Sequence, residues 1–306
     1  LRALFAGQQS GIEAHKLLIV QEIRLPRTLL CIAVGAILGL CGAVMQGLFR
    51  NPLADPGIIG VSGGAALGAA LAIVLLAPLS QQWQSLLGIG LLPLLAFLGG
   101  ALTTTLVYLL GTREGGTSVT VMLLAGVAIT ALSGAVLGLL TYLADDQMLR
   151  NLSLWQMGSL AAGKPVDVAL ALLTLAALLI LFLRDANPLN ALLLGEGEAR
   201  HLGIQVQSLK RRLILLTAAG VGVAVAVAGM IGFVGLVVPH LVRLLAGPNH
   251  VRLLPLSALL GAGLLLGADM LARTLLAPAE LPVGIITALM GAPFFIWLLV
   301  KSRRTL

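Results

Sequence analysis

Long apolar stretches separated by short polar segments run through this chain of 306 residues, and they limit its fold more than any other feature. Many of them approach the ~20 residues that an α-helix needs to cross the hydrocarbon core of a bilayer. Hydrophobic residues make up 59% of the chain and charged residues only 10%, so a water-soluble domain could not bury this apolar surface. The sequence therefore predicts an all-α polytopic membrane protein, because a membrane β-barrel would show short strands of alternating polarity instead.

We expect nine membrane spans in this chain. Their predicted limits are Leu25–Phe49, Val61–Leu76, Leu91–Leu110, Thr120–Leu143, Val166–Leu183, Leu213–Ile231, Val234–Leu245, Leu254–Leu271 and Val283–Val300. Leu1 is not an initiator residue and Leu1–Glu22 has the character of an extramembrane segment, so we expect a further span to precede this chain.

The most polar long interval, Ala191–Arg212, lies between two of these apolar blocks. It combines a Gly-Glu-Gly-Glu run, a short amphipathic piece and a Lys-Arg-Arg cluster, a pattern that favours a small helical protrusion binding a soluble partner. Of the 19 Lys and Arg residues, the larger share falls on the side that would hold this interval and the C-terminus. The positive-inside rule therefore places the interval in the cytoplasm, and it explains the net charge of +7 without nucleic-acid binding.

Residues 24–49 weakly resemble residues 211–236, since each segment has a basic start, a Gly/Ala-rich helix and a break followed by a proline. On the orientation above, the two segments enter the membrane from opposite sides. Many transporters show this inverted-repeat pattern and carry their substrate route at the repeat interface. The alternative is that any two Gly/Ala-rich spans resemble each other.

Three arginines are predicted at the outer ends of spans, where Arg24 and Arg27 flank Pro26 and Arg273 follows Asp269. Exposed arginines are disfavoured on this side of the membrane, and the planar guanidinium binds a carboxylate with two hydrogen bonds. We therefore expect an acidic soluble partner to dock on these three arginines from outside. Snorkelling of the single side chains to the membrane surface is the alternative.

The segment Asn51–Gly60 interrupts the membrane pattern with two prolines and Asp55, which predicts a rigid cytoplasmic turn. Asn51 and Leu53 could close the inner end of a transport route, facing Thr117–Thr120 in the next cytoplasmic loop. Residue chemistry alone favours a simple connector over this gate.

The segment Ala144–Lys164 is too apolar in its middle for an ordinary loop and too short to span a bilayer. A re-entrant or interfacial helix explains both properties. Trp155, Met157 and Ser159 could then line the mouth of a route, or Trp155 could be an interfacial anchor.

Nothing in the sequence indicates catalysis, because Walker A, His-Glu-x-x-His and Gly-x-Ser-x-Gly motifs are absent. His240 has no second His or Cys at metal-ligand spacing, so we expect no metal site. Cys31 and Cys41 are predicted about 15 Å apart along one helix, too far for a mutual disulfide. Energy must then come from a partner, unless the chain is an ion-coupled carrier with Asp269, its deepest acidic residue, as the coupling group.

Ordered blocks over essentially the whole chain resemble one family, the FecCD-type permease subunits of bacterial ABC importers for haem, iron-siderophores and cobalamin. The blocks are RLPRTL (24–29), GAVMQGLFRNPLADPGIIGVSGGA (42–65), LLAGVA (123–128), GEGEARHLGI (195–204), GFVGLVVPHLVR (232–243) and AELPVGIITALMGAPFFIWLL (279–299).

The resemblance implies a single transmembrane permease domain over residues 1–306, with a fold of ten helices of which the first is absent here. Residues 191–212 would be its cytoplasmic coupling segment. The resemblance also implies a homodimer in the bacterial inner membrane, two cytoplasmic ATPase subunits and a periplasmic substrate-binding protein. ATP and Mg would bind to the ATPase subunits, and the permease would be no enzyme and would hold no permanent cofactor.

The resemblance assigns roles to individual residues as well. The ATPase-coupling residues would be Gly195, Glu196, Gly197, Glu198, Ala199, Leu202 and Gly203. Arg24, Arg27 and Arg273 would meet glutamates of the binding protein. Asn51, Leu53, Val119 and Thr120 would form the inner gate, and Trp155 and Met157 complete the predicted pathway residues.

The chain departs from the family pattern at SVTV (118–121), where two of the gate residues lie. Residues 145–160 look most like haem permeases. Haem is therefore the expected cargo, with a ferric siderophore or cobalamin as the alternatives.

Overall fold

The computed structural model describes residues 17–77, 90–113, 116–161 and 163–302, and it is almost entirely helical. Nine helices match the nine predicted spans. They are α3 (Leu25–Leu48), α4 (Val61–Ala70, continued by the π-helical η3, Leu71–Leu75), α6 (Leu91–Gly111), α7 (Val119–Leu143), α9 (Pro165–Arg184), α12 (Val206–Ala228), α13 (Val234–Ala246), α14 (His250–Thr274) and α15 (Val283–Ser302). Six helices in the described residues are long and apolar enough to cross a membrane, and three shorter apolar helices accompany them. The predicted polytopic helical architecture is confirmed.

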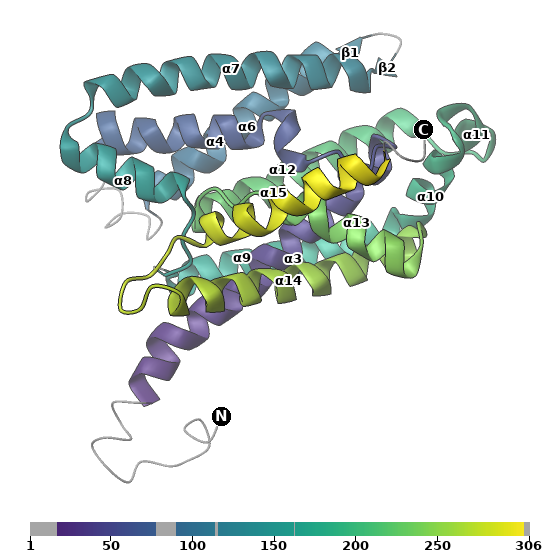
Figure 1. The fold of residues 1–306 in the computed structure, drawn as a ribbon. Helices are drawn as coiled ribbons and strands as arrows, with labels where there is room; N and C mark the ends of the chain where they lie inside the picture. The colour runs from purple at the N-terminus through teal and green to yellow at the C-terminus, as the bar shows by residue number, and fades with distance from the viewer. Residues whose placement is uncertain (1–16, 78–89, 114–115, 162, 303–306) are drawn as a thin grey trace.

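Shorter elements connect these helices. They are η1 (Ile19–Arg24), η2 (Pro56–Ile59), the hairpin of β1 (Thr112–Arg113) and β2 (Gly116–Thr117), α8 (Asp146–Gln156), α10 (Ala186–Leu194) and α11 (Glu196–His201). Figure 1 shows α10 and α11 at one end of the bundle and α8 near the opposite end. We call these the α11 end and the α8 end. Within the predicted extramembrane segment Leu1–Glu22, residues 1–16 lie outside the described residues, and η1 leads directly into α3.

Helix α3 forms the centre of the bundle and is buried along most of its length, with α9, α12, α13 and α14 packed around it. Glycines permit the closest crossings. A Cβ atom on Gly35 would overlap the carbonyl oxygen of Gly261 in α14, and one on Gly42 would overlap that of Gly235 in α13. Small residues allow such close approach of helices in lipid. Helices α4, α6 and α7 form a second group beside this core (Figure 1).

Helices α3 and α12 run in opposite directions, as the inverted-repeat prediction requires (Figure 1). Each is followed by a break and then a shorter helix, α4 after α3 and α13 after α12. The two breaks meet inside the bundle, where Pro56 and Gly232 line a cavity of about 80 Å³ together with Leu38 of α3 and Val221 of α12. The opposite directions of α3 and α12 and the meeting of their two breaks are features that an inverted repeat requires.

The prediction that Asn51–Gly60 is a cytoplasmic turn is wrong for the second half of this segment. Asp55 lines the same cavity as Leu38, which lies midway along α3. The carbonyl of Ile58 also lies against Gly126, well inside α7. The segment therefore folds back into the bundle, because its prolines end α3 and its 3-10 turn η2 redirects the chain into α4.

Candidate functional site

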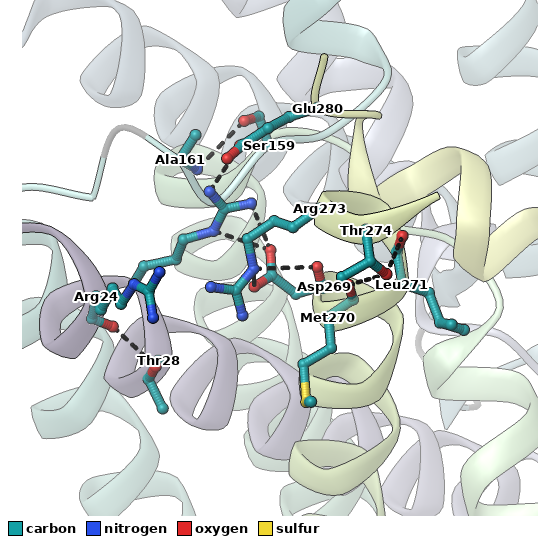
Figure 2. A network of polar contacts seen from close by, with 11 residues as sticks. Arg24, Thr28, Ser159, Ala161, Asp269, Met270, Leu271, Arg273, Thr274 and Glu280 are labelled. Carbon is teal, nitrogen blue, oxygen red and sulfur yellow. Dashed lines mark hydrogen bonds and ion pairs between the residues drawn. The ribbon is translucent and has the colours of Figure 1, made fainter. Parts of the chain in front are cut away.

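A cluster of four charged side chains lies at the α8 end of the bundle (Figure 2). Arg27 of α3 donates from Nε and Nη2 to Oδ1 of Asp269 in α14, at 3.0 and 2.8 Å, and from Nη1 to Oε2 of Glu280, at 2.7 Å. Nε of Arg273 lies 3.1 Å from the other carboxylate oxygen of Asp269. Asp269 is only 1% exposed, so two arginines compensate one buried carboxylate.

This cluster corrects the prediction of three exposed arginines. Arg27 is 7% exposed and is already paired within the chain, because Asp269 and Glu280 are brought to it by α14 and the segment that follows. The side chain of Arg273 is 27% exposed, and Arg24 is exposed without an ion pair among the described residues. The docking role of all three stays a prediction.

Asp269, the predicted candidate for ion coupling, is held between the guanidinium groups of Arg27 and Arg273. Asp55 is a second acidic residue inside the bundle, where it lines the cavity beside Leu38. Oδ1 of Asp55 accepts a hydrogen bond of 2.7 Å from the backbone N–H of Gly57 and so caps η2. Each carboxylate therefore has a structural role in the fold.

The segment that contains α8 forms the helix expected for Ala144–Lys164. Helix α8 is amphipathic, with Leu152 as its buried residue. Trp155 and Ser159 line a cavity of about 370 Å³ at this end together with Lys164, whereas Met157 is 42% exposed and does not belong to the lining.

At the α11 end, Gly195 separates α10 from α11 with a φ of 126°, a backbone conformation that favours glycine. The predicted coupling residues take different positions around this short helix. Ala199 is fully buried against the bundle. Glu198 and Leu202 are exposed, and the space beside the Cα atom of Gly197 is open. This exposed face ends at Gly203, which has a φ of 82°.

Helices α10 and α11 are held against the bundle by ion pairs and a hydrogen bond that sequence reasoning missed. Asp185, just before α10, pairs with Arg212 of α12, and Oδ1 of Asn190 accepts the backbone N–H of His250 at 2.8 Å. Glu196 of α11 pairs at 2.5 Å with Nζ of Lys210, a side chain that is 3% exposed.

A signal for the burial of Lys210 exists in the sequence. Val206, Leu209, Leu213 and Ile214 recur at helical spacing and are buried in α12, and Lys210 falls on the same face. Residues 210–212 look like one exposed basic cluster in the sequence. In the structure Arg211 is exposed, whereas Lys210 is buried.

The four predicted gate residues lie near the α11 end, where α3 ends and α7 begins. Asn51 accepts the backbone N–H of Leu53 through Oδ1 at 2.9 Å, which closes a tight turn after α3. Val119 is the first residue of α7 and packs on the core, and Thr120 is exposed. No hydrogen bond within the described part of the chain joins the two pairs, so their joint action as a gate stays a prediction.

An open groove of about 570 Å³ runs between η2, α4 and α7. Asp55, Ser62 and Thr130 supply its polar groups, and the other lining residues are small or aliphatic. On the α7 side of this groove, α7 exposes apolar side chains, among them Val127 of the lining, which is 66% exposed, and Leu124, which is also 66% exposed. The groove and this face together form a surface that the described residues leave uncovered.

The comparisons with known proteins all find transport proteins. The model of the FecCD transport family matches residues 1–301. A hemin transport system permease protein of Yersinia pestis is 50% identical over 285 residues, 92% of this chain and 83% of the relative. A vitamin B12 import system permease protein of Salmonella newport is 44% identical over 309 residues, 99% of this chain and 92% of the relative.

The fold comparison agrees with the sequence comparison. A solved metal-chelate type ABC transporter in an inward-facing conformation superposes with a TM-score of 0.84 at 36% identity, covering 97% of this chain and 91% of the other. The six long apolar helices fit a multi-pass inner-membrane protein, and the family model matches almost the entire length of the chain. The chain belongs to the FecCD transport family, the permease subunits of bacterial ABC importers.

Proposed function

We propose that this chain is the permease subunit of an ATP-driven importer that moves haem across the bacterial inner membrane. The observation that carries the proposal is the 50% identity, over 92% of this chain, with the hemin permease of Yersinia pestis. Relatives named for cobalamin or vitamin B12 reach 44%, so cobalamin is an alternative cargo, and a ferric siderophore is another.

The permease acts as a homodimer in this proposal. The groove beside Asp55 is open on one side, and the exposed apolar face of α7, which includes Leu124 and Val127, flanks it. A second copy packed against this face would cover the apolar side chains and close the groove into a route. Few polar groups line the groove, which suits a large, rigid and mostly apolar cargo.

The ATPase subunits bind at the α11 end, which is then the cytoplasmic end. Leu194 and Leu202 are 68% and 64% exposed there, and Glu198 lies between them in sequence. Apolar side chains beside a charge on a short protruding helix fit a groove in a soluble subunit. ATP and Mg bind to these subunits, and the permease itself catalyses no reaction.

The periplasmic binding protein docks at the α8 end. Arg24 and Arg273 present accessible guanidinium groups there, and acidic residues of the partner would pair with them. Arg27 does not contact the partner in this proposal. It pairs with Asp269 inside the chain, and Asp269 in turn contacts Arg273.

A secondary carrier is the rival from another class. It needs a carboxylate that binds and releases an ion during transport. Asp269 is paired with two arginines, and Asp55 caps a turn, so neither is an unengaged coupling group. These contacts favour the ATP-driven importer.

The test is uptake into liposomes that hold the permease with its ATPase and binding protein. Haem, a ferric siderophore and cobalamin are offered in turn, with and without ATP. We expect haem uptake that requires both ATP and the binding protein. Uptake of another of the three would keep the importer and change its cargo, and uptake driven by a proton gradient without ATP would overturn the proposal.

A further inference from the structure

Lys210 is a buried cation near the start of α12 that bridges two separate elements. Its residue is 2% exposed. Nζ donates a hydrogen bond of 3.0 Å to the backbone carbonyl of Thr117 in β2 and lies 2.5 Å from Oε1 of Glu196 in α11. A buried ammonium group is stable only when it is paired and hydrogen-bonded, so these two contacts hold the side chain in one place.

A second side chain of α12 holds the same residue of the hairpin. Oε1 of Gln207 accepts the backbone N–H of Thr117 at 2.9 Å. Both backbone polar groups of Thr117 are therefore bonded to α12, and Thr117 itself is 6% exposed. The start of the neighbouring helix cannot move far from α12 without breaking these bonds.

Helix α7 begins directly after this anchor. Ser118 is its N-cap, and Val119 and Thr120, which are predicted gate residues, form its first turn. Only Ser118 separates them from Thr117. A displacement of Thr117 by a fraction of a helical turn would thus change the position of both gate residues.

We propose that Lys210 is a positioning residue that transmits movement of α11 to the first turn of α7. This inference rests on the proposed function, in which the ATPase subunits bind α11. When they move α11, Glu196 shifts the ammonium group, and the ammonium group shifts the carbonyl of Thr117. The Lys210 side chain is buried, so solvent screens its ion pair with Glu196 little. A movement of Glu196 therefore acts directly on the ammonium group.

The alternative is a passive anchor that only stabilises the fold. An anchor predicts that its loss lowers stability or assembly, with no selective effect on the response to ATP. A positioning residue predicts normal assembly and ATP hydrolysis together with a gate that no longer follows ATP. The two roles therefore differ in an observable that does not depend on stability.

The experiment uses the assembled complex in nanodiscs with a Thr120→Cys probe and a membrane-impermeant maleimide. Cys31 and Cys41 are completely buried and do not interfere. The labelling rate is measured with and without ATP, next to ATP hydrolysis and subunit assembly. Lys210→Met removes the ammonium group. Arg211→Met is the matched control, because it removes a positive charge from the next residue, whose side chain is exposed.

A second pair of variants approaches the contact from α11, where the Glu196 side chain is 33% exposed and replacement disturbs the core little. Glu196→Gln keeps an oxygen that can accept a hydrogen bond from Lys210, and Glu196→Met does not. Both variants lose the same charge, so a direct effect of this charge on the ATPase subunits is equal in the two.

We expect Lys210→Met and Glu196→Met to reduce the ATP-dependent change in labelling at least fivefold, roughly the lower limit of a typical coupling between two sites. Glu196→Gln should retain more of the change than Glu196→Met, Arg211→Met should keep it, and all variants that assemble should hydrolyse ATP. An unchanged response in Glu196→Met, or equal losses in both Glu196 variants, would overturn the proposal. An absence of any ATP response in the parent probe would overturn it too.

The labelling readout does not depend on the cargo. If haem uptake fails while ATP still changes the labelling of residue 120 through Lys210, the cargo assignment is wrong and the relay stands. If haem uptake succeeds and the Lys210 and Glu196 variants label like the parent, the importer stands and the relay is wrong.

Discussion

Arg27 and Asp269 lie 242 residues apart in the sequence and form a buried ion pair with two hydrogen bonds. The pair connects the first turn of α3 to the last turns of α14, and Glu280 and Arg273 complete it. One of the arginines that looked like an exposed docking residue is therefore a structural link between two central helices.

Loss of Arg27 should destabilise the permease far more than loss of Arg24. Arg27→Met leaves the carboxylate of Asp269 with one of its two arginines, and breaking a buried pair costs about 3–5 kcal/mol. Arg24→Met is the matched control, since Arg24 is exposed and surface substitutions change stability by roughly 0.5 kcal/mol or less. Thermal unfolding in detergent measures both, and equal melting temperatures would contradict the assigned role of Arg27.

Docking of the binding protein should depend on the two accessible arginines. Arg24→Glu should weaken binding by up to about fivefold, the range of an exposed ion pair. Arg273→Glu should weaken binding too, and it also places a second carboxylate beside the buried Asp269. The effect should shrink at high salt, because exposed charges are screened beyond about 8–10 Å at physiological ionic strength. Binding is measured at low and high salt, with Arg211→Glu at the α11 end as the control, and unchanged affinity would favour snorkelling.

Charge reversal on α11 should impair coupling in a graded way. Glu198→Lys changes an exposed side chain and should weaken ATPase binding, whereas Glu196→Lys also places a second cation beside the buried Lys210. We therefore expect the larger loss of ATP-driven uptake in Glu196→Lys. Co-purification and uptake are compared with Glu22→Lys, which carries the same charge change at the exposed η1. Normal uptake in both α11 variants would exclude this helix from coupling.

Gly42→Ala should destabilise the bundle because a Cβ atom there would overlap the backbone of Gly235 in α13. Overpacking of this kind costs about 1–3 kcal/mol. Gly134→Ala in α7 has open space around the added methyl group, and it should be neutral or stabilising by roughly 0.5–1 kcal/mol. Melting temperatures of the two variants give the comparison, and the same value for both would argue against the close α3–α13 crossing.

Asp55 allows the structural and ion-coupling roles of a deep carboxylate to be separated. Asp55→Asn keeps an oxygen that can accept the N–H of Gly57, so it should preserve stability and ATP-driven uptake. Asp55→Ala loses this cap, which should cost about 1 kcal/mol. Loss of uptake in Asp55→Asn at unchanged stability would instead indicate that the carboxylate itself takes part in transport.

The nine helices, and all their ends within a few residues except the start of α12, follow from apolar length, glycine content and proline positions, which are local properties of the chain. The protrusion could be predicted because Ala191–Arg212 is polar where its neighbours are apolar. The start of α12 was placed too late, at Leu213 instead of Val206, because charged residues in its first turns resemble a loop.

The burial of individual charges could not be predicted in this way. Arg24 ends η1 and Arg27 lies in the first turn of α3, and both look like membrane-end arginines, yet only Arg27 faces the carboxylates of Asp269 and Glu280. Lys210 and Arg211 differ in the same manner. The burial of Arg27 depends on Asp269, 242 residues away in sequence, about which a local pattern carries no information, whereas the burial of Lys210 follows the apolar face of α12.

By itself, the sequence determined the membrane class, the helical spans and the family, because these depend on hydrophobic length and on ordered motifs. Only the tertiary structure decided that Asp55 returns into the bundle, that Arg27 is paired inside the chain, and that Lys210 connects α11 to the start of α7. The physical reason is that a charge in an apolar interior must find a partner, and that partner is chosen by how the helices pack.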